Sequence, residues 1–196
     1  GCNPAGAAQG TTNDNCLRDR TWRFLRLYTF TGKKGLDQIM QPIRENAPFF
    51  LKFVLPDDCN ETDKEENLVA AEEVAEALKS GKAVEIINAV IKGDLILRSM
   101  TVQDQVTIRR SKIRGLLDCS YATFKKVVSL ENSTFEQDVT FTGALFEKSI
   151  LCNGSVFRGK ADFGGIQIGI SAVFTEAMFI QDASFNSAQV EQHIFF

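Results

Sequence analysis

The feature that most constrains this chain is an apolar ladder that runs without a miss from Ile86 to Phe196. Steps of alternately five and six residues from Ile86 land on an apolar residue each time, and ten of the sixteen phenylalanines are among the rungs. An apolar or small residue also lies two positions before each rung, as at Ala122 and Ser133. The ladder requires a fold that turns a pair of side chains inward every five or six residues. The rungs are Ile86, Ile91, Leu97, Val102, Ile108, Ile113, Cys119, Phe124, Leu130, Phe135, Phe141, Phe146, Cys152, Phe157, Phe163, Ile168, Phe174, Phe179, Phe185, Val190 and Phe196.

An eleven-residue apolar period would also suit a right-handed helical coiled coil. Within each eleven-residue repeat, the apolar residues fall at offsets 0, 3, 5 and 9 from the first rung. At about 100° per residue these offsets point to opposite sides of a helix, so no single seam forms. Abundant Phe, Val, Ile and Thr together with frequent glycine favour short strands instead.

In the strand interpretation each five- or six-residue unit is one side of a coil followed by a corner. The residues beside a rung face outward because side chains alternate along a strand. Charged residues such as Arg98, Lys125 and Glu147 follow the rungs, and turn-forming residues such as Asn132 and Gly154 come next. Four units close a square coil of 22 residues, so residues 82–196 are expected to form a β-solenoid of about five coils.

This ladder resembles the pentapeptide-repeat family in its Phe-rich variant, as in STFEQDVTFTGALF (133–146) and AVFTEAMFIQDASF (172–185). The resemblance covers about 115 of the 196 residues. It implies a mainly β protein, a right-handed quadrilateral β-helix with an α-helical N-terminal cap. The Ala-Asp/Asn-Leu unit that is familiar in this family is nearly absent. Every second unit also has six residues, whereas the family's repeat has five. The geometry of the corners therefore stays open.

The segment before the ladder divides into two parts. Residues 1–14 are rich in Gly, Ala, Asn and Thr and are expected to form a flexible leader. Residues 15–81 are expected to be a helical N-terminal segment, with helices over 16–30 and 36–46, the second kinked or broken near Pro42. The apolar run 48–55 is too short to decide between a buried helix and a strand.

The last part of this segment predicts an amphipathic helix from about 63 to 79. Thr62 and Glu65 fit a capping box, and Gly81 is placed to end the helix. Leu68, Ala71, Ala75 and Leu78 fall on one face, with Val74 beside them. We expect this face to cover the open end of the first coil.

No pattern in the chain indicates a catalytic, cofactor or metal site. His193 is the single histidine and is interpreted as a surface residue, and the cysteines lack metal-ligand spacing. Residues 81–196 hold 12 acidic and 12 basic side chains, so nucleic-acid binding is not expected. A gyrase inhibitor that mimics duplex DNA, known within the family, is an alternative that would require a more acidic solenoid. We therefore expect a non-catalytic scaffold that binds an unknown protein partner through an outer face.

One cluster of basic residues is a candidate surface for an anionic partner or lipid headgroups. The alternative is a solubilising edge that acids on neighbouring coils offset. This basic cluster comprises Arg109, Arg110, Lys112, Arg114, Lys125 and Lys126.

Location and assembly are less constrained. Gly1-Cys2 fits the remnant of a lipoprotein signal with a lipidated Cys2, or a cloning-derived glycine at an arbitrary boundary. We favour a bacterial, extracytoplasmic protein (periplasmic or lipid-anchored, tethered through Cys2 or through flanking segments) over a cytoplasmic one. Phe196 is itself a rung, which is consistent with an end-to-end homodimer or with a piece of a longer protein. Cys119 and Cys152 are expected to be small buried hydrophobic residues.

Overall fold

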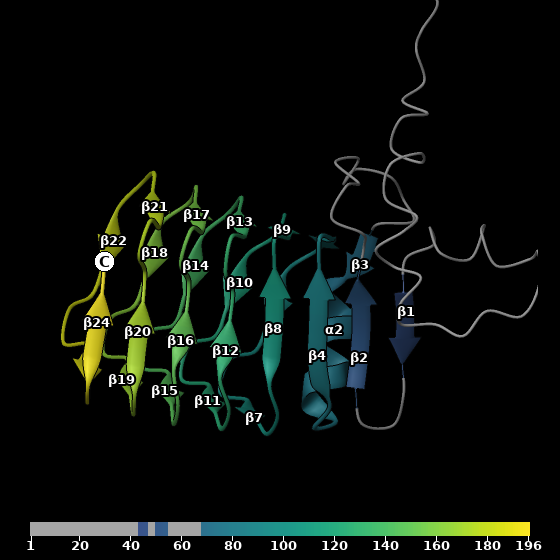
Figure 1. Ribbon diagram of the computed structural model, residues 1–196, viewed down its shortest axis with the longest axis horizontal. Helices are drawn as coiled ribbons and strands as arrows, with labels where there is room; N and C mark the ends of the chain where they lie inside the picture. Colours follow the sequence, from purple (N-terminus) through teal and green to yellow (C-terminus); the bar gives the residue numbers. More distant parts are fainter. Residues whose placement is uncertain (1–42, 47–49, 55–67) are drawn as a thin grey trace, which may run out of the picture. The chain divides into compact units, whose positions relative to one another are not determined.

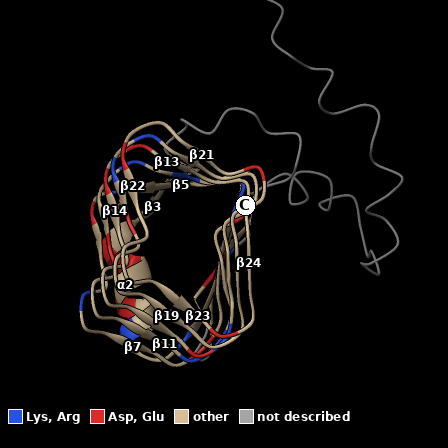
Figure 2. Cartoon of the chain, turned by 90° about the vertical axis from the view of Figure 1, so that its left-hand side faces the viewer, with Lys and Arg blue, Asp and Glu red and all other residues tan. Residues whose placement is uncertain are grey.

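The computed structural model describes residues 43–46, 50–54 and 68–196, which form a four-sided β-solenoid (Figure 1). Short parallel strands stack in four sheets, and the chain climbs from one coil to the next in about six right-handed turns. Figure 2 looks along the stack and shows the four sides around the common core. The predicted solenoid is therefore confirmed, with one more turn than the sequence suggested.

Each sheet forms one face, and the chain visits faces A, B, C and D in that order. Face A contains β1 (Ile43–Asn46), β2 (Phe50–Val54), β4 (Ala83–Ile87), β8 (Val106–Arg109), β12 (Val128–Ser129), β16 (Ile150–Leu151), β20 (Ser171–Val173) and β24 (His193–Phe195). Face B contains β3 (Leu68–Ala70), β5 (Val90–Lys92), β9 (Lys112–Ile113), β13 (Thr134–Phe135), β17 (Val156–Phe157) and β21 (Met178–Phe179). Face C contains β6 (Leu95–Ile96), β10 (Leu117–Asp118), β14 (Val139–Thr140), β18 (Ala161–Asp162) and β22 (Ala183–Ser184). Face D contains β7 (Thr101–Val102), β11 (Thr123–Phe124), β15 (Leu145–Phe146), β19 (Gln167–Ile168) and β23 (Gln189–Val190).

The strands of the ladder stack in a 22-residue register, so equivalent residues of successive coils form columns. Leu117 pairs with Val139 on face C, and Phe124 pairs with Phe146 on face D. Since parallel neighbours lie about 4.8 Å apart, each column presents one side chain at every such step.

The core is the ladder itself. Every rung from Ile86 to Phe174 is buried, and Phe135, Phe146 and Phe157 are at most 1% exposed. The phenylalanines stack along the axis: the ring centroids of Phe135 and Phe157 lie 4.8 Å apart, and those of Phe157 and Phe179 lie 4.9 Å apart. This spacing matches the separation of the coils, so ring stacking and strand pairing support the same register.

The alternation of five- and six-residue units arises from two kinds of corner. In all ten five-residue intervals, the residue two positions after the rung has a positive φ between 50° and 65°. In the six-residue intervals only Gly93 has a positive φ. A residue with left-handed backbone lets the chain turn the corner with one residue fewer than in the six-residue intervals. Asn or Gly occupies five of these ten positions because these residues tolerate a positive φ. The left-handed corner residues are Asn88, Ser99, Arg110, Tyr121, Asn132, Gly143, Gly154, Gly165, Glu176 and Ser187.

A ladder of buried serines lines the inside beside the A–B corners. Ser111, Ser133 and Ser155 succeed one another at 22-residue steps and are at most 4% exposed. The backbone N–H of Ser111 donates to Ser133 Oγ, and that of Ser133 donates to Ser155 Oγ, each at 3.3 Å. The Ser133 hydroxyl donates in turn to the Ile108 carbonyl at 3.1 Å. These buried hydroxyls are therefore satisfied without water.

Helix α2 (Ala71–Lys79) covers the N-terminal end of the core, as the sequence predicted. It lies between β3 on face B and β4 on face A, and it packs against β4, β6 and β7. Ala71, Val74, Ala77 and Leu78 are buried in the same apolar cluster as the rungs. The helix thus replaces the C and D sides of this first coil.

The predicted start of this helix at about residue 63 is wrong. Leu68–Ala70 is strand β3, whose backbone pairs in parallel with Val90–Lys92, and sheet pairing overrides the helical pattern here. The helix begins from an extended Ala70 with no side-chain cap, so Leu68 does not belong to its apolar face. The proposed capping residues Thr62 and Glu65 lie outside the described residues.

Two further strands precede the helix. The apolar run that the sequence left undecided contains β2, which pairs in parallel with β4 and buries Leu51 and Phe53. The helix expected over 36–46 is wrong for Ile43–Asn46, because this segment pairs antiparallel with β2 as strand β1. Stacked strands thus begin before residue 82. The leader 1–14, the helix predicted over 16–30 and Cys2, Cys16 and Cys59 lie outside the described residues.

Candidate functional site

The six residues of the basic cluster do not converge on one face. Arg109 ends β8 on face A, Arg110 forms the A–B corner, and Lys112 lies on face B. Arg114 follows β9 toward face C, while Lys125 and Lys126 lie between face D and face A. The cluster is therefore a belt around one coil.

Acidic residues of the next coil accompany this belt. Arg109 Nε lies 3.0 Å from Glu131 Oε2, and Lys112 Nζ lies 3.9 Å from Glu136 Oε1. Lys125 forms an ion pair with Glu147, which is 22 residues further along the chain. Because each acid lies next to its partner, these pairs reduce the positive field around the belt. Binding of an anionic partner here stays a prediction, and the geometry gives it little support.

Charge alternation extends along several columns. Arg114, Glu136 and Arg158 share one column, in which the N–H groups of Glu136 and Arg158 donate to Ile113 and Phe135. In another column, Asp138 lies beside Lys160, whose backbone N–H donates to Asp138 Oδ1 at 2.8 Å. Opposite charges on neighbouring coils attract each other. If a coil paired with the next coil but one, residues of like charge would lie side by side in these columns. Lys92 beside Arg114 and Lys126 beside Lys148 are exceptions.

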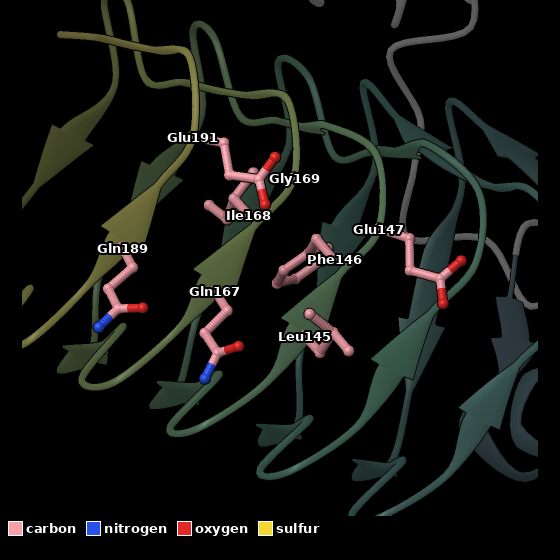
Figure 3. A pocket seen from close by; sticks show the side chains of 8 residues that line it. All are labelled: Leu145, Phe146, Glu147, Gln167, Ile168, Gly169, Gln189 and Glu191. Carbon is pink, nitrogen blue, oxygen red and sulfur yellow. The ribbon is translucent and has the colours of Figure 1, made fainter.

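A notch of about 310 Å³ opens on the outer surface of face D (Figure 3). Its floor is Gly169, next to the backbone of Phe146 and Ile168. Glu147 and Glu191 flank it along the stack, and the side chains of Gln167 and Gln189 extend side by side from β19 and β23. In Figure 3 the Glu191 side chain leans over the place of Gly169. The notch therefore combines two carboxylates, two carboxamides and one apolar wall, Leu145.

Outward-facing side chains change character along faces A and B. The middle column of face A runs from Glu85, Thr107 and Ser129 to Leu151, Val173 and Phe195. On face B, Lys112 and Thr134 give way to Val156 and Met178, and Ile180 follows. Met178, Ile180 and Phe195 are 54%, 63% and 48% exposed. We refer to Leu151, Val156, Val173, Met178, Ile180 and Phe195 as the apolar band.

One buried carboxylate lies on face C. Asp118 faces outward from β10 but is only 2% exposed, because the Arg98 side chain covers it. Burial by itself raises the pKa of Asp118, and hydrogen bonds from the Ser120 side chain and backbone and from Arg98 outweigh burial, so the pKa lies below its usual value. Arg98 Nε donates to Asp118 Oδ2 at 3.0 Å. The group is a structural ion pair and not a proton donor.

The other residues considered from the sequence offer no reactive centre. Cys119 and Cys152 are buried rungs, and burial raises the pKa of each thiol far above its usual value. His193 is exposed on β24, and its ring centroid lies 5.7 Å from that of Phe195. Within the described ranges, no three His, Cys, Asp or Glu side chains gather as metal ligands would. No helix in those same ranges has the length and apolar character to cross a membrane.

The sequence interpretation missed both the notch and the apolar band. Glu147, Gly169 and Glu191 stand 22 residues apart in sequence, so the column register contained the signal for the notch. For the band, the signal was the apolar outward residues such as Leu151 and Met178, which break the alternation of inward apolar and outward polar positions.

Comparison with known proteins gives no relative. No protein-family model matches the chain, and no curated protein or solved structure matches it.

Proposed function

We propose that this protein is a non-catalytic scaffold of the Phe-rich pentapeptide-repeat type, which binds a protein partner through the apolar band. The observation that carries this proposal is the change of the outward columns from polar to apolar at coils whose inward rungs remain apolar throughout. A solvated outer face gains nothing from Met178, Ile180 and Phe195, whereas a protein interface is stabilised by large apolar side chains at its centre.

The scaffold supports binding through its rigidity. Stacked rungs hold the backbone under the band in one arrangement, so the outward side chains are presented at fixed coil spacing. A preformed surface loses less conformational entropy on binding than a flexible one. Faces A and B meet at the corner formed by Gly154 and Glu176, so the band continues around one edge.

A photo-crosslinking experiment tests the proposal. A photoreactive phenylalanine analogue replaces Ile180 in the full chain, expressed in its native cells, and Lys92 is the matched control because it occupies the same column of face B. We expect one adduct of defined mass from position 180 and none from position 92. An adduct of twice the chain mass would identify the partner as a second copy. Equal adducts from both positions, or none from position 180, would contradict the proposal.

The identified partner then allows a quantitative test. Replacing Ile180 by Asp should weaken its Kd in isothermal titration calorimetry by at least about tenfold, because it places a charge in an apolar contact. Lys92→Ala should leave the Kd within about twofold.

A further inference from the structure

The column that borders the notch has a gap in its charge pattern. Gln103, Lys125, Glu147, Gly169 and Glu191 succeed one another at 22-residue steps. Backbone N–H groups fix this register, since Gly169 donates to Phe146 at 2.8 Å and Glu191 donates to Ile168 at 2.9 Å. Lys125 pairs with Glu147, but no side chain separates Glu147 from Glu191. A cation is therefore missing where the alternation would place one.

The chain cannot supply that cation from position 169. A Cβ on Gly169 would lie 2.8 Å from the Glu147 carbonyl oxygen, closer than real Cβ atoms approach. The close approach of the two coils thus requires glycine, and the same glycine leaves the notch open.

The charges that remain favour a cationic occupant. The Cα atoms of Glu147 and Glu191 are two coils apart, roughly 10 Å, so a group between them lies within about 5 Å of each column position. Among the residues that the structure describes, Glu191 has no ion-pair partner, and its side chain leans over Gly169 (Figure 3). The carboxamide oxygens of Gln167 and Gln189 offer further acceptors for N–H donors.

The size and lining select the kind of cation. A volume of about 310 Å³ is at the lower end for ligand pockets and suits one long side chain. Leu145 provides an apolar wall for a methylene stem, whose charged head can reach the carboxylates. Two carboxylates at this separation do not provide the six to eight converging oxygens that Ca²⁺ requires.

We propose that the notch of face D binds the side chain of an arginine or lysine from a partner polypeptide. The cationic head lies beside the Glu191 carboxylate over Gly169, takes the place of the missing cation in the column, and donates to the carboxamide oxygens of Gln167 and Gln189. The Glu147 carboxylate pairs with Lys125 and is directed away from the notch in Figure 3, so Glu191 supplies the main attraction. This site is on face D, whereas the apolar band is on faces A and B. The experiments on the notch therefore test this proposal separately from the proposed function.

The test is a nuclear magnetic resonance titration of the full chain at low salt. The probes are the peptides Ac-Gly-Gly-Arg-Gly-Gly-NH2 and its lysine counterpart, with a norleucine peptide as the uncharged control. We expect saturable shifts of the Gly169 and Glu191 amide signals with the charged peptides only, at millimolar Kd. Raising the salt concentration should weaken the binding because it is electrostatic.

Three variants decide the assignment. Glu191→Gln should weaken binding about two- to fivefold, as expected for one exposed ion pair. Glu176→Gln, an exposed acid of the same coil, should leave the Kd unchanged. Gln189→Lys places a cation of the chain itself at the notch and should abolish the shifts. Equal shifts with norleucine, no saturation at Gly169, or equal Kd values for Glu191→Gln and the unaltered chain would overturn the proposal. The amide spectrum of each variant verifies that it is folded.

Discussion

Truncation of Phe157 to alanine should be one of the most destabilising single changes in the described part of the chain. The Phe157 side chain is fully buried, and its ring stacks on Phe135 and Phe179 at centroid distances of 4.8 and 4.9 Å. Its centroid also lies 5.9 Å from that of Phe163, at an interplanar angle of 85°. Core Phe→Ala changes cost about 3–5 kcal/mol, and each aromatic pair adds about 0.5–1.5 kcal/mol beyond burial. Three lost pairs place this variant near the top of that range, at about 5 kcal/mol.

Phe196→Ala is the matched control, because Phe196 is a rung of the same ladder but 69% exposed. About one third of its side chain is buried, and its ring lies 5.8 Å from Phe174 and 5.5 Å from Phe185 at the exposed end of the stack, so its loss should cost about 1–2 kcal/mol, well below the cost at Phe157. Urea unfolding followed by circular dichroism gives both free energies. A domain has only about 5–15 kcal/mol of stability, so the alanine variant could fail to fold. In that case Phe157→Leu replaces it in the same measurement, with an expected cost of about 2 kcal/mol. If Phe157→Ala costs less than about 2 kcal/mol, or no more than Phe196→Ala, then stacking along the axis does not hold the coils together.

Three further measurements follow from the corners, the buried carboxylate and the thiols. Glu176→Gly should stabilise the protein by up to about 1 kcal/mol in urea unfolding, because Glu176 has φ 59° and left-handed backbone is strained for non-glycine residues; Thr175→Gly should instead destabilise it. Asp118→Asn should cost about 1–3 kcal/mol at pH 7. The pKa of Asp118 is lowered by folding, so its contribution is present above the unfolded pKa of about 3.9 and is lost as the pH falls through the folded value; a variant equally costly at pH 3 and pH 7 would contradict this. Cys119 and Cys152 should react with a thiol reagent only after unfolding, and a fast reaction of either of these two thiols in the folded chain would show that the coils open.

The sequence was sufficient to predict the parts of the fold that repeat. Every rung, such as Phe146, repeats the same five- and six-residue spacing. One misassigned residue would therefore not have changed the predicted register. The strands at Ile43–Asn46 and Leu68–Ala70 could not be predicted in this way, because each occurs once and pairs with a distant segment. Such pairing is a tertiary interaction, and the local helical pattern around Leu68 gave the opposite answer.

The surfaces were predictable only in part. The 22-residue coil that the sequence predicts places Asp138 beside Lys160, and the hydrogen bond from the Lys160 backbone N–H to Asp138 Oδ1 agrees with that register. For the basic cluster, the local density of cations left two interpretations, an anion-binding surface and a solubilising edge offset by acids of neighbouring coils. Arg109 and Lys125 lie on different sides and pair with acids of the next coil, an arrangement that the second interpretation describes. The notch depends on how closely the coils approach at Gly169, a distance that no linear pattern contains.

The two corner types also restrict how this chain can change in length. Removing a single five- or six-residue unit would put a left-handed corner where the other kind belongs, and would turn every later face by a quarter. Removing eleven residues keeps the order of corners but carries the notch to the opposite side of the axis from the segments before it. Only a change of 22 residues, one whole coil, preserves the direction in which every surface points. Insertions and deletions within the ladder should therefore come in multiples of one coil wherever two surfaces must engage the same partner.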